Sequence, residues 1–282
     1  MIRTTLLTIL LSVFAGCSAP VMPPDPEARV KVMSYNLRYG DESLDQEDSR
    51  QVNLLASIHH HRPDLLGVQE ANEPWMEILP RELKDYAYVG VGRDDGVAAG
   101  ERSAIFYLAD KFEVIETGTF WLSETPEEPS FGWGATNRRV CTWAYLRNRF
   151  TGTVTAHFNT HLDHEVHEAR VKGMAIILDR IAQSPHPVIL TGDFNIIEGS
   201  ELYETVEATK LSDTKHSAAE SRPYSTMNWF IPDEETAWVI DYVFAEEGRF
   251  DVLRYEVDHT WRYDGKPVSD HYPVLAELAL VN

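Results

Sequence analysis

Short runs rich in β-branched and aromatic residues recur along almost the whole chain, and this feature limits the possible folds more than any other. Many of the runs alternate apolar and polar positions, as the two faces of a sheet require. Helical spacing of apolar residues is clear only in 46–61 and 166–183, which end before Pro63 and Pro185. So much predicted sheet with so few helices favours two packed sheets with helices outside over one open parallel layer. The predicted strands are 30–37, 64–69, 86–91, 103–107, 112–122, 140–147, 153–160, 188–191, 237–244, 252–257 and 274–280.

Length and charge narrow the class of protein. The chain has 282 residues, 43% of them hydrophobic, which is enough for a large core and excludes a disordered protein. No internal repeat or second linker interrupts residues 30–282, so we expect one domain there. The formal net charge of −20 argues against a basic surface that binds phosphate backbones. A phosphate-bearing substrate must therefore be held locally, by a metal ion or a few cationic side chains.

The first 17 residues have the pattern of an export signal. Arg3 is followed by an apolar stretch over 6–14 and then by Ala15 and Gly16, directly before Cys17. This ending resembles the lipobox of bacterial lipoproteins, in which the cysteine is acylated. An ordinary cleaved signal peptide is the alternative. We expect an exported lipoprotein of the bacterial cell envelope, attached to the membrane through a lipid on Cys17.

A short tether is predicted between this anchor and the domain. Residues 18–29 contain four prolines and little that can be buried, which suits an extended segment. The chain has one other cysteine, Cys141, in an apolar run. If Cys17 carries lipid, Cys141 has no partner within the chain, and we interpret it as a small buried hydrophobic residue.

Acids, amides and histidines follow apolar runs at the ends of predicted strands. Strand ends meet at one rim of a sheet, so these separate segments can form a shared polar pocket. Each residue alone has an ordinary structural explanation, such as a turn or a helix cap. Together they indicate a site, because a buried polar cluster is costly unless a cation or substrate organises it. The residues are Asn36, Glu70, His161, His164, Asp193, Asn195, Asp241, Asp270 and His271.

The residue types in this cluster indicate hydrolysis assisted by a metal ion. Glu70 and the amide oxygen of Asn36 are hard donors that suit Mg²⁺, Mn²⁺ or Ca²⁺. The sequence has no cysteine pair and no His-x-x-x-His on a predicted helix, which zinc sites use. The run HHH at 59–61 is interpreted as a solvated helix end. The sequence also lacks a GxSxG elbow and a Walker motif, which leaves attack by water, with an acid and a histidine managing protons.

The same residues lie in segments that resemble the endonuclease/exonuclease/phosphatase superfamily, whose fold is that of DNase I. The resemblance spans almost the whole domain and implies an α/β fold: a four-layered α/β/β/α sandwich of two mixed sheets packed face to face with helices outside. Three further stretches, GRDDG (92–96), GTFWLSETP (118–126) and RRVCTWAYL (138–146), resemble a bacterial secreted branch. The superfamily segments are SYNLRYG (34–40), LLGVQEA (65–71), NTHLDH (159–164), TGDFN (191–195), IDYVF (240–244) and SDHYPV (269–274).

The resemblance implies a metal site. Asn36 and Glu70 would hold the principal ion, with Asp270 close to it, and the cofactor would be one or two Mg²⁺ or Mn²⁺ ions. The chain departs from the pattern at Trp238, where the related branch has an arginine just before the IDY segment. One cation on the substrate side is therefore missing.

The resemblance also implies catalytic roles. Asp193 would orient or deprotonate the attacking water. Asn195 and His161 would contact the phosphoryl oxygen on which charge builds. His271 would be the second member of the proton-handling pair, with Asp241 fixing its tautomer.

Three further residues are candidates for substrate contact. Arg139, or its neighbour Arg138, could bind phosphate, although an arginine beside a strand start is as often on the surface. Tyr107 could face the pocket or pack in the core. Trp133 lies in a loop and is either a stacking platform or a loop anchor.

We therefore expect a monomeric, metal-dependent phosphoesterase that cleaves a P–O bond by in-line attack of water. A small-molecule, glycan or lipid-headgroup phosphoester is favoured as substrate. A secreted nuclease of the same fold is the first alternative, so nucleic acid stays a possible partner that is not favoured. A non-catalytic surface binding protein is the second.

Overall fold

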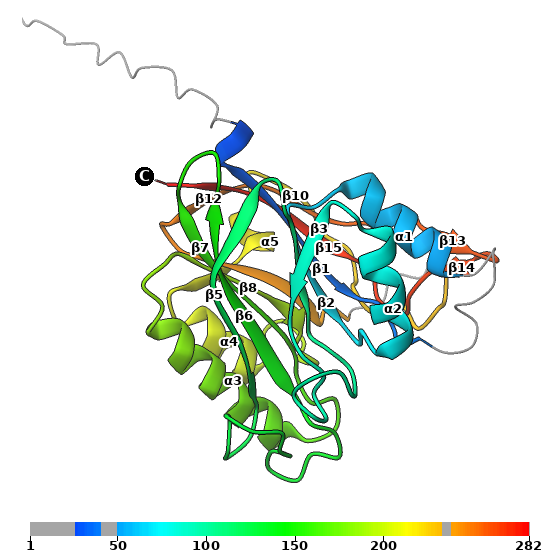
Figure 1. Cartoon of the computed structure of the whole chain (residues 1–282), viewed down its shortest axis with the longest axis vertical. Coiled ribbons are helices and arrows are strands. Elements are labelled where there is room, and N and C mark those ends of the chain that lie inside the picture. The colour runs from blue at the N-terminus through cyan, green and yellow to red at the C-terminus, as the bar shows by residue number, and fades with distance from the viewer. Residues whose placement is uncertain (1–25, 41–49, 233–237, 282) are drawn as a thin grey trace, which may run out of the picture.

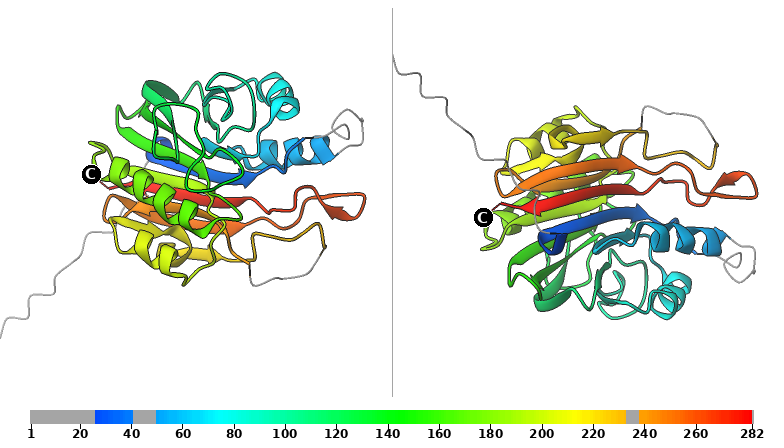
Figure 2. Two further views of the ribbon diagram at one scale, coloured as in Figure 1. Left: turned by 90° about the horizontal axis from the view of Figure 1, so that it is seen from below. Right: turned by 90° about the horizontal axis from the view of Figure 1, so that it is seen from above.

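The structure, a computed structural model, describes residues 26–40, 50–232 and 238–281. Two mixed β-sheets pack face to face, and helices cover the outer face of each (Figures 1 and 2). This confirms the predicted four-layered sandwich. The proposed signal, Cys17 and the tether as far as residue 25 lie outside the described residues. The described chain begins with a 3-10 turn, η1 (Pro26–Ala28), directly before the first strand.

The first sheet has seven strands. Its central strand β1 pairs in parallel with β2 and antiparallel with β15, and β4 extends the sheet beyond β2. In spatial order the strands are β10 (Glu220–Arg222), β12 (Phe250–Val257), β15 (Val274–Leu280), β1 (Arg29–Asn36), β2 (Leu65–Gln69), β4 (Ile105–Leu108) and β3 (Tyr86–Val89).

The second sheet has six strands, with β7 and β8 parallel at its centre. In spatial order they are β5 (Phe112–Trp121), β6 (Val140–Asn148), β7 (Val154–His161), β8 (Val188–Asp193), β11 (Asp241–Glu246) and β9 (Leu211–Asp213). Every predicted strand has a counterpart in one of the two sheets. The sequence did not predict β9, β10 or the hairpin of β13 (Arg262–Tyr263) and β14 (Lys266–Pro267), because two or three residues are too few to show a period.

Both predicted helices form, as α1 (Arg50–His61) and α3 (His167–Ala182). The unpredicted helices are α2 (Glu73–Glu82), whose pattern is interrupted by Pro74 and Pro80, and the short α4 (Glu201–Glu207) and α5 (Thr214–Ser217). α1 and α2 cover the seven-stranded sheet, while α3 and α4 cover the six-stranded one (Figure 1). None of the helices within the described residues is long and apolar enough to cross a membrane.

The run of histidines at the end of α1 is only partly solvated. His59 and His60 are exposed, as expected. His61 Nε2, however, lies 2.6 Å from Asp258 Oδ2, and Asp258 also accepts a hydrogen bond from Trp261 Nε1 (2.8 Å). The prediction of a solvated helix end is therefore wrong for His61, because the last turn of α1 packs against the segment after β12.

Side chains between the two sheets change from apolar to polar along each strand. Alternate residues of β1 face the second sheet, and they run from Val32 through Ser34 to Asn36. In β8 the series starts at Ile189 and ends at Asp193. Because β1, β2, β7 and β8 all end on the same side, their last residues form one polar rim over an apolar core. Figure 2 shows β1 running toward the side of the molecule on which this rim lies.

A buried polar network joins the sheets just below the rim. Asn159 Nδ2 donates to the carbonyl of Val68 (2.9 Å), and Asn159 Oδ1 accepts from Gln69 Nε2 (2.8 Å) and Thr191 Oγ1 (2.9 Å). Glycine is required at position 67, since a Cβ on Gly67 would lie 2.3 Å from Thr191 Oγ1. The network therefore fixes the spacing of the two sheets directly under the polar rim.

The buried polar network under the rim predicts that the free energy of unfolding depends on pH. His157 is fully buried, and its Nε2 lies 2.9 Å from Thr191 Oγ1. Burial lowers the pKa of His157 to about 3. The unfolded chain has an ordinary histidine pKa near 6.5 and therefore binds the proton more tightly than the folded chain does. The stability that neutral His157 contributes is complete above pH 6.5 and is lost as the pH falls toward 3. Its full size is roughly 5 kcal/mol.

Urea unfolding at pH 7 and at pH 4.5 measures this effect. The free energy of unfolding of the wild type should fall by roughly 2 to 3 kcal/mol more than that of His157→Gln, which cannot take up the proton. His59→Gln, on an exposed turn of α1, is the matched control and should behave as the wild type. Equal pH dependence in wild type and His157→Gln would contradict the assignment.

Candidate active site

One carboxylate oxygen at the end of β8 lies at the centre of the polar rim. Asp193 Oδ2 accepts a hydrogen bond from Asn36 Nδ2 at 2.9 Å, which links the two sheets. His161 Nε2 lies 3.4 Å from the same oxygen and His271 Nε2 3.7 Å from it. Asp193 Oδ1 accepts from the backbone N–H of Asn195 (3.0 Å). Asp193 is thus surrounded by donors from both sheets.

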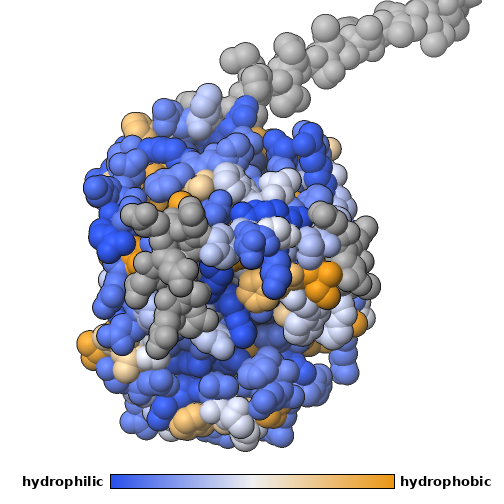
Figure 3. All heavy atoms as spheres, turned by 90° about the vertical axis from the view of Figure 1, so that its right-hand side faces the viewer, coloured by the Kyte–Doolittle hydropathy of each residue, from blue (hydrophilic) through white to orange (hydrophobic). Residues whose placement is uncertain are grey.

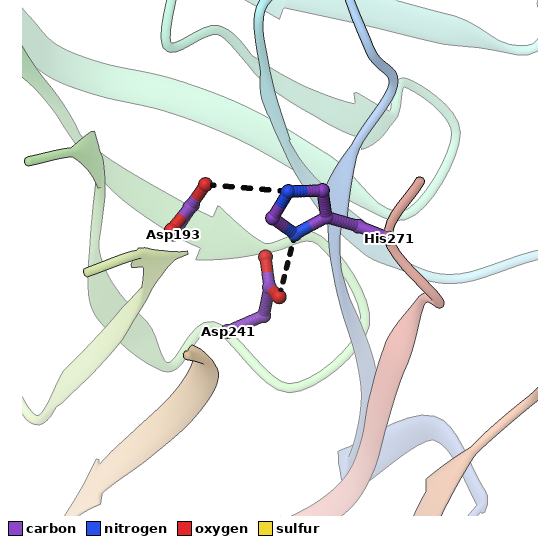
Figure 4. Close-up of side chains that lie close together, drawn as sticks. All are labelled: Asp193, Asp241 and His271. Carbon is purple, nitrogen blue, oxygen red and sulfur yellow. Dashed lines mark hydrogen bonds and ion pairs between the residues drawn. The ribbon is translucent and has the colours of Figure 1, made fainter. Parts of the chain in front are cut away.

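Asp241 and His271 form a buried pair beside Asp193 (Figure 4). His271 Nδ1 lies 2.8 Å from Asp241 Oδ2, so its Nε2 is directed toward Asp193. The backbone N–H of Asp241 donates to Thr226 Oγ1 (3.1 Å), which fixes the start of β11. This hydrogen bond to Asp241 therefore fixes the orientation of the imidazole.

The electrostatics of this group differ from those of the isolated side chains. Burial lowers the pKa of His271, but the negative charges of Asp241 and Asp193 outweigh it and raise the value above its usual range. Burial and the charge of Asp241 raise the pKa of Asp193 to about 7. The site therefore pairs an imidazolium with a carboxyl group that can accept a proton near neutral pH.

A second pair of acids lies next to this group. Glu70 Oε1 accepts from Asn36 Nδ2 (2.9 Å) and Glu70 Oε2 from the backbone N–H of Tyr39 (2.9 Å). Asp270 Oδ1 is buried without a hydrogen-bond partner, and its other oxygen lies 3.7 Å from Arg38 Nη1. Burial and the charge of Glu70 raise the pKa of Asp270. The half-buried carboxylate of Glu70 and the buried one of Asp270, which has an unpartnered oxygen, repel each other and form a set of oxygen donors that fits a divalent cation.

Several residues of this rim have a strained backbone conformation. Arg38, Glu70 and Asn195 have φ values of 57°, 58° and 50°, in the left-handed region that non-glycine residues rarely adopt. Such strain is retained where the surroundings enforce it, and it clusters at functional sites. The side chain of Asn195 donates to the carbonyl of Leu162 (3.1 Å), which holds the turn after β8.

A second set of donors could also hold a metal ion. The ligand atoms of Asp193, Asp241 and His271 all lie within 4.8 Å of one another. In this group, however, the hydrogen bond between Asp241 and His271 already uses one nitrogen of the imidazole. A hard cation prefers oxygen ligands, so Glu70 and Asp270 suit Mg²⁺ better than this mixed set does.

The reactive group opens into a cavity of about 650 Å³. One side of the cavity carries Arg93, Arg139 and Arg170, with Glu101 paired to Arg93 at 2.7 and 3.0 Å. Arg139 is 6% exposed; its Nη2 lies 2.8 Å from His164 Nδ1 and its Nε lies 3.7 Å from the buried Asp163 Oδ2. Its Nη1 has no hydrogen-bond partner, and a buried guanidinium with an unsatisfied N–H group suits an anion. Figure 3 shows this side of the molecule, which is mainly hydrophilic with a group of hydrophobic side chains near its middle.

Comparison with known proteins shows the family to which the chain belongs. The model of the endonuclease/exonuclease/phosphatase family matches residues 33–271. The chain belongs to this family.

Similar solved structures agree with that assignment. A member of the endonuclease/exonuclease/phosphatase family from Bacteroides thetaiotaomicron is 34% identical, with a TM-score of 0.84 over 92% of this chain and 99% of that one. A mannosyl-6-phosphatase from the same organism is 35% identical, with a TM-score of 0.82 over 88% and 99% of the two chains. A curated relative, an uncharacterized protein of Acanthamoeba polyphaga mimivirus, is 24% identical over 269 residues, 87% of this chain and 98% of that protein. The protein is therefore a phosphoesterase of this family.

Most of the residues predicted to form the phosphoesterase site do come together at the rim. Asn36 does so with its amide nitrogen between Glu70 and Asp193, while its oxygen accepts from the backbone N–H of Arg38 (2.9 Å). Asn36 thus aligns the two carboxylates, and its role as an oxygen ligand stays a prediction. The residues that line the cavity as predicted are Glu70, Arg139, His161, Asp193, Asn195, Asp270 and His271, with Asp241 directly behind His271.

Two predicted substrate contacts lie elsewhere. Tyr107 is opposite Leu65 at the start of β2, and it packs on the core between the sheets, at the end of β2 away from Glu70. Trp133 packs beside α3, with Lys172 Nζ 5.6 Å from its ring centre, and it is not among the cavity residues. Both predictions are corrected: Tyr107 is a core residue and Trp133 is a loop anchor.

Other residues of the phosphoesterase cavity were missed. Arg93 lies in the GRDDG stretch that resembles the bacterial secreted branch, but that resemblance gave it no role. Arg170 lies on α3, and no motif in the sequence indicated it. Trp229 and Trp238 form much of the opposite side. Trp238 had drawn attention only as a departure from the family pattern.

Proposed function

We propose that this phosphoesterase removes a phosphoryl group from a sugar or another small phosphomonoester, with Mg²⁺ or Mn²⁺ as cofactor. The observation that carries the proposal is Arg139, a buried guanidinium that lines the cavity with His161 and whose Nη1 has no hydrogen-bond partner. A local cation of this kind suits a compact anion in a chain of net charge −20. The similarity to a mannosyl-6-phosphatase supports a phosphate carried on a sugar.

The metal would be held mainly by Glu70 and Asp270, with Asn36 beside them. A bound divalent cation would neutralise charge on the phosphoryl oxygens and make the phosphorus more electrophilic. Asn36 ends β1, Glu70 directly follows β2, and Asp270 lies shortly before β15, so neighbouring strands of one sheet position the proposed ligands.

The side chains divide the rest of the reaction among them. Asp193 accepts a proton from the attacking water as the new P–O bond forms and the bond to the leaving alcohol breaks. His271 lies beside Asp193, on the same side of the reacting phosphorus, and its charge stabilises the carboxylate and a phosphoryl oxygen. Asn195 and His161 donate to the phosphoryl oxygens as charge builds. The leaving oxygen takes its proton from solvent.

Arg139 gives a direct test of the anion site. Arg139→Met keeps an unbranched apolar stem but removes the guanidinium and its charge, and we expect kcat/KM to fall about 10- to 100-fold, mostly through KM, because hydrogen bonds to charged groups contribute roughly 1.5–3 kcal/mol. Arg138→Met is the matched control, since Arg138 pairs with Asp94 outside the main cavity. Similar losses in both variants would contradict the assignment.

A substrate panel tests the proposed function. Mannose 6-phosphate, glycerol 3-phosphate, a phosphodiester, and single- and double-stranded DNA are incubated with the enzyme and Mg²⁺ at physiological salt. We expect kcat/KM for the best small phosphomonoester to exceed that for DNA per scissile bond. Efficient cleavage of plasmid or oligonucleotide without turnover of any small phosphoester would favour a nuclease.

The N-terminal segment supports a second proposal, that the enzyme is exported and anchored by a lipid on Cys17. The sequence pattern over residues 1–17 is its support. Cell fractionation should place the wild type with membranes and release Cys17→Ser into the soluble fraction. A soluble wild type would overturn this proposal.

A further inference from the structure

The side of the cavity opposite the arginines is apolar. The order of strands in the six-stranded sheet is β6, β7, β8, β11, so Arg139 and His161 lie on one side of Asp193 and the segment before β11 lies on the other. That second side of the cavity carries Ile197, Met227, Trp229, Trp238 and Ile240. A substrate that contacts both sides must have an anionic part and an apolar or ring-shaped part.

Two tryptophans dominate this apolar side. Trp229 is 54% exposed and Trp238 49% exposed, and their rings lie 6.2 Å apart at an interplanar angle of 80°. Tyr39 and Ile197 are also exposed and line the same cavity. Large apolar side chains left open to solvent around a reactive pocket indicate a binding surface.

The position of Trp229 is fixed by the active-site segment itself. Trp229 has a φ of 56°, in the left-handed region, and the backbone N–H of the next residue, Phe230, donates to Asn228 Oδ1 (2.8 Å). Asn228 is fully buried; its backbone N–H donates to the carbonyl of Asp270 (2.8 Å) and its Nδ2 to the carbonyl of Ser269 (3.1 Å). A strained conformation held by buried hydrogen bonds presents Trp229 at a defined place beside the reactive group.

The other tryptophan is tied to the same framework. The carbonyl of Trp238 accepts from the backbone N–H groups of Thr226 (2.9 Å) and Met227 (3.1 Å). Met227 in turn forms a bridge with His271. The backbone of both tryptophans is therefore held at a defined place relative to His271, as a specificity surface requires.

We propose that Trp229 and Trp238 form a platform for the pyranose ring of the substrate, while Arg139 holds its phosphoryl group. This inference rests on the proposed function and names the part of the substrate that confers specificity. Perpendicular indoles form a corner, not a parallel slot, so a flat nucleobase cannot be stacked between them. A compact sugar ring can lie with its apolar C–H face on one indole and its edge against the other.

The test compares a substrate with a ring to one without. We expect Trp229→Ala and Trp238→Ala each to lower the ratio of kcat/KM for mannose 6-phosphate over glycerol 3-phosphate about tenfold, through KM, the upper end of what an aromatic contact contributes. Trp133→Ala removes a tryptophan outside the cavity and should leave the ratio unchanged. Calorimetric titration with mannose 6-phosphate in EDTA measures binding without turnover and should show the same tenfold weakening.

The results separate the platform from the proposed function. Equal losses for both substrates, an unchanged ratio, or a selective loss for a nucleoside 5′-monophosphate would overturn the sugar platform. If the wild type binds mannose 6-phosphate but hydrolyses no small phosphomonoester, the proposed function fails and the binding of the two tryptophan variants still decides the platform. If the wild type does not bind mannose 6-phosphate, the sugar platform is wrong, and turnover of glycerol 3-phosphate still decides the proposed function.

Discussion

Replacing Asp193 with asparagine should lower kcat by at least ~10²-fold, the usual scale for a positioned proton-transfer group. Asparagine has nearly the same shape, and its Oδ1 can still accept the hydrogen bond from the backbone of Asn195. It cannot take a proton from water. The burial and negative surroundings that raise the pKa of Asp193 to about 7 make the carboxylate a suitable base near neutral pH, and this property is lost with the amide.

His271→Ala should produce a loss of similar size, because the imidazole lies 3.7 Å from the same carboxylate and is oriented by Asp241. The double variant of Asp193 and His271 should lose much less than the product of the two single effects, since the residues act as one unit. Steady-state kinetics on the best substrate measures kcat, and thermal unfolding verifies that each variant is folded.

His59→Ala is the control for this series, because His59 is exposed on α1, away from the cavity. It should leave kcat within about twofold of the wild type. A loss at His59 comparable to that at Asp193, or independent additive losses at Asp193 and His271, would show that the site has been placed wrongly.

The positions of the residues at the polar rim were predictable from sequence because they follow from strand geometry. Residues two apart on a strand face the same side, so Asn36 and Asp193 at strand ends had to approach one another once β1 and β8 were in facing sheets. The prediction needed only the apolar runs and the polar residues that ended them. The pairing of Asp241 with His271 did not follow from strand geometry. It was implied by the resemblance to the superfamily.

The remainder of the cavity depends on loops, whose paths the sequence does not specify. Tyr107 and Arg139 both lie on or beside strands, but only the order of strands in the sheets shows that Tyr107 faces the core and Arg139 the pocket. Trp133 and Trp229 both lie in loops with similar sequence signals. Only Trp229 is joined to the active-site segment, through the buried side chain of Asn228, and that link is a contact between distant parts of the chain.

Removal of divalent cations should abolish activity, and Mg²⁺ or Mn²⁺ should restore it. Glu70, which is half-buried, and the buried Asp270 line the same cavity, where their charges repel, and Asp270 Oδ1 has no hydrogen-bond partner. A bound cation removes this repulsion between the two carboxylates, so metal binding should also stabilise the fold. At a Mg²⁺ concentration of about 100 times the dissociation constant, the gain is about 2.7 kcal/mol, measurable as a rise in Tm.

Glu70→Gln makes this prediction specific to the proposed site. The burial of Glu70 acts against its ionisation, but the hydrogen bond from Asn36 and the charge of His271 lower its pKa, so the carboxylate is ionised at neutral pH and ready to bind a cation. The amide lacks that charge, and the variant should need far more Mg²⁺ both for activity and for the rise in Tm. Glu73→Gln, at the exposed start of α2, is the matched control and should respond to Mg²⁺ as the wild type does. Full activity in EDTA, restoration by Zn²⁺ alone, or an unchanged response in Glu70→Gln would place the metal elsewhere or remove it from the mechanism.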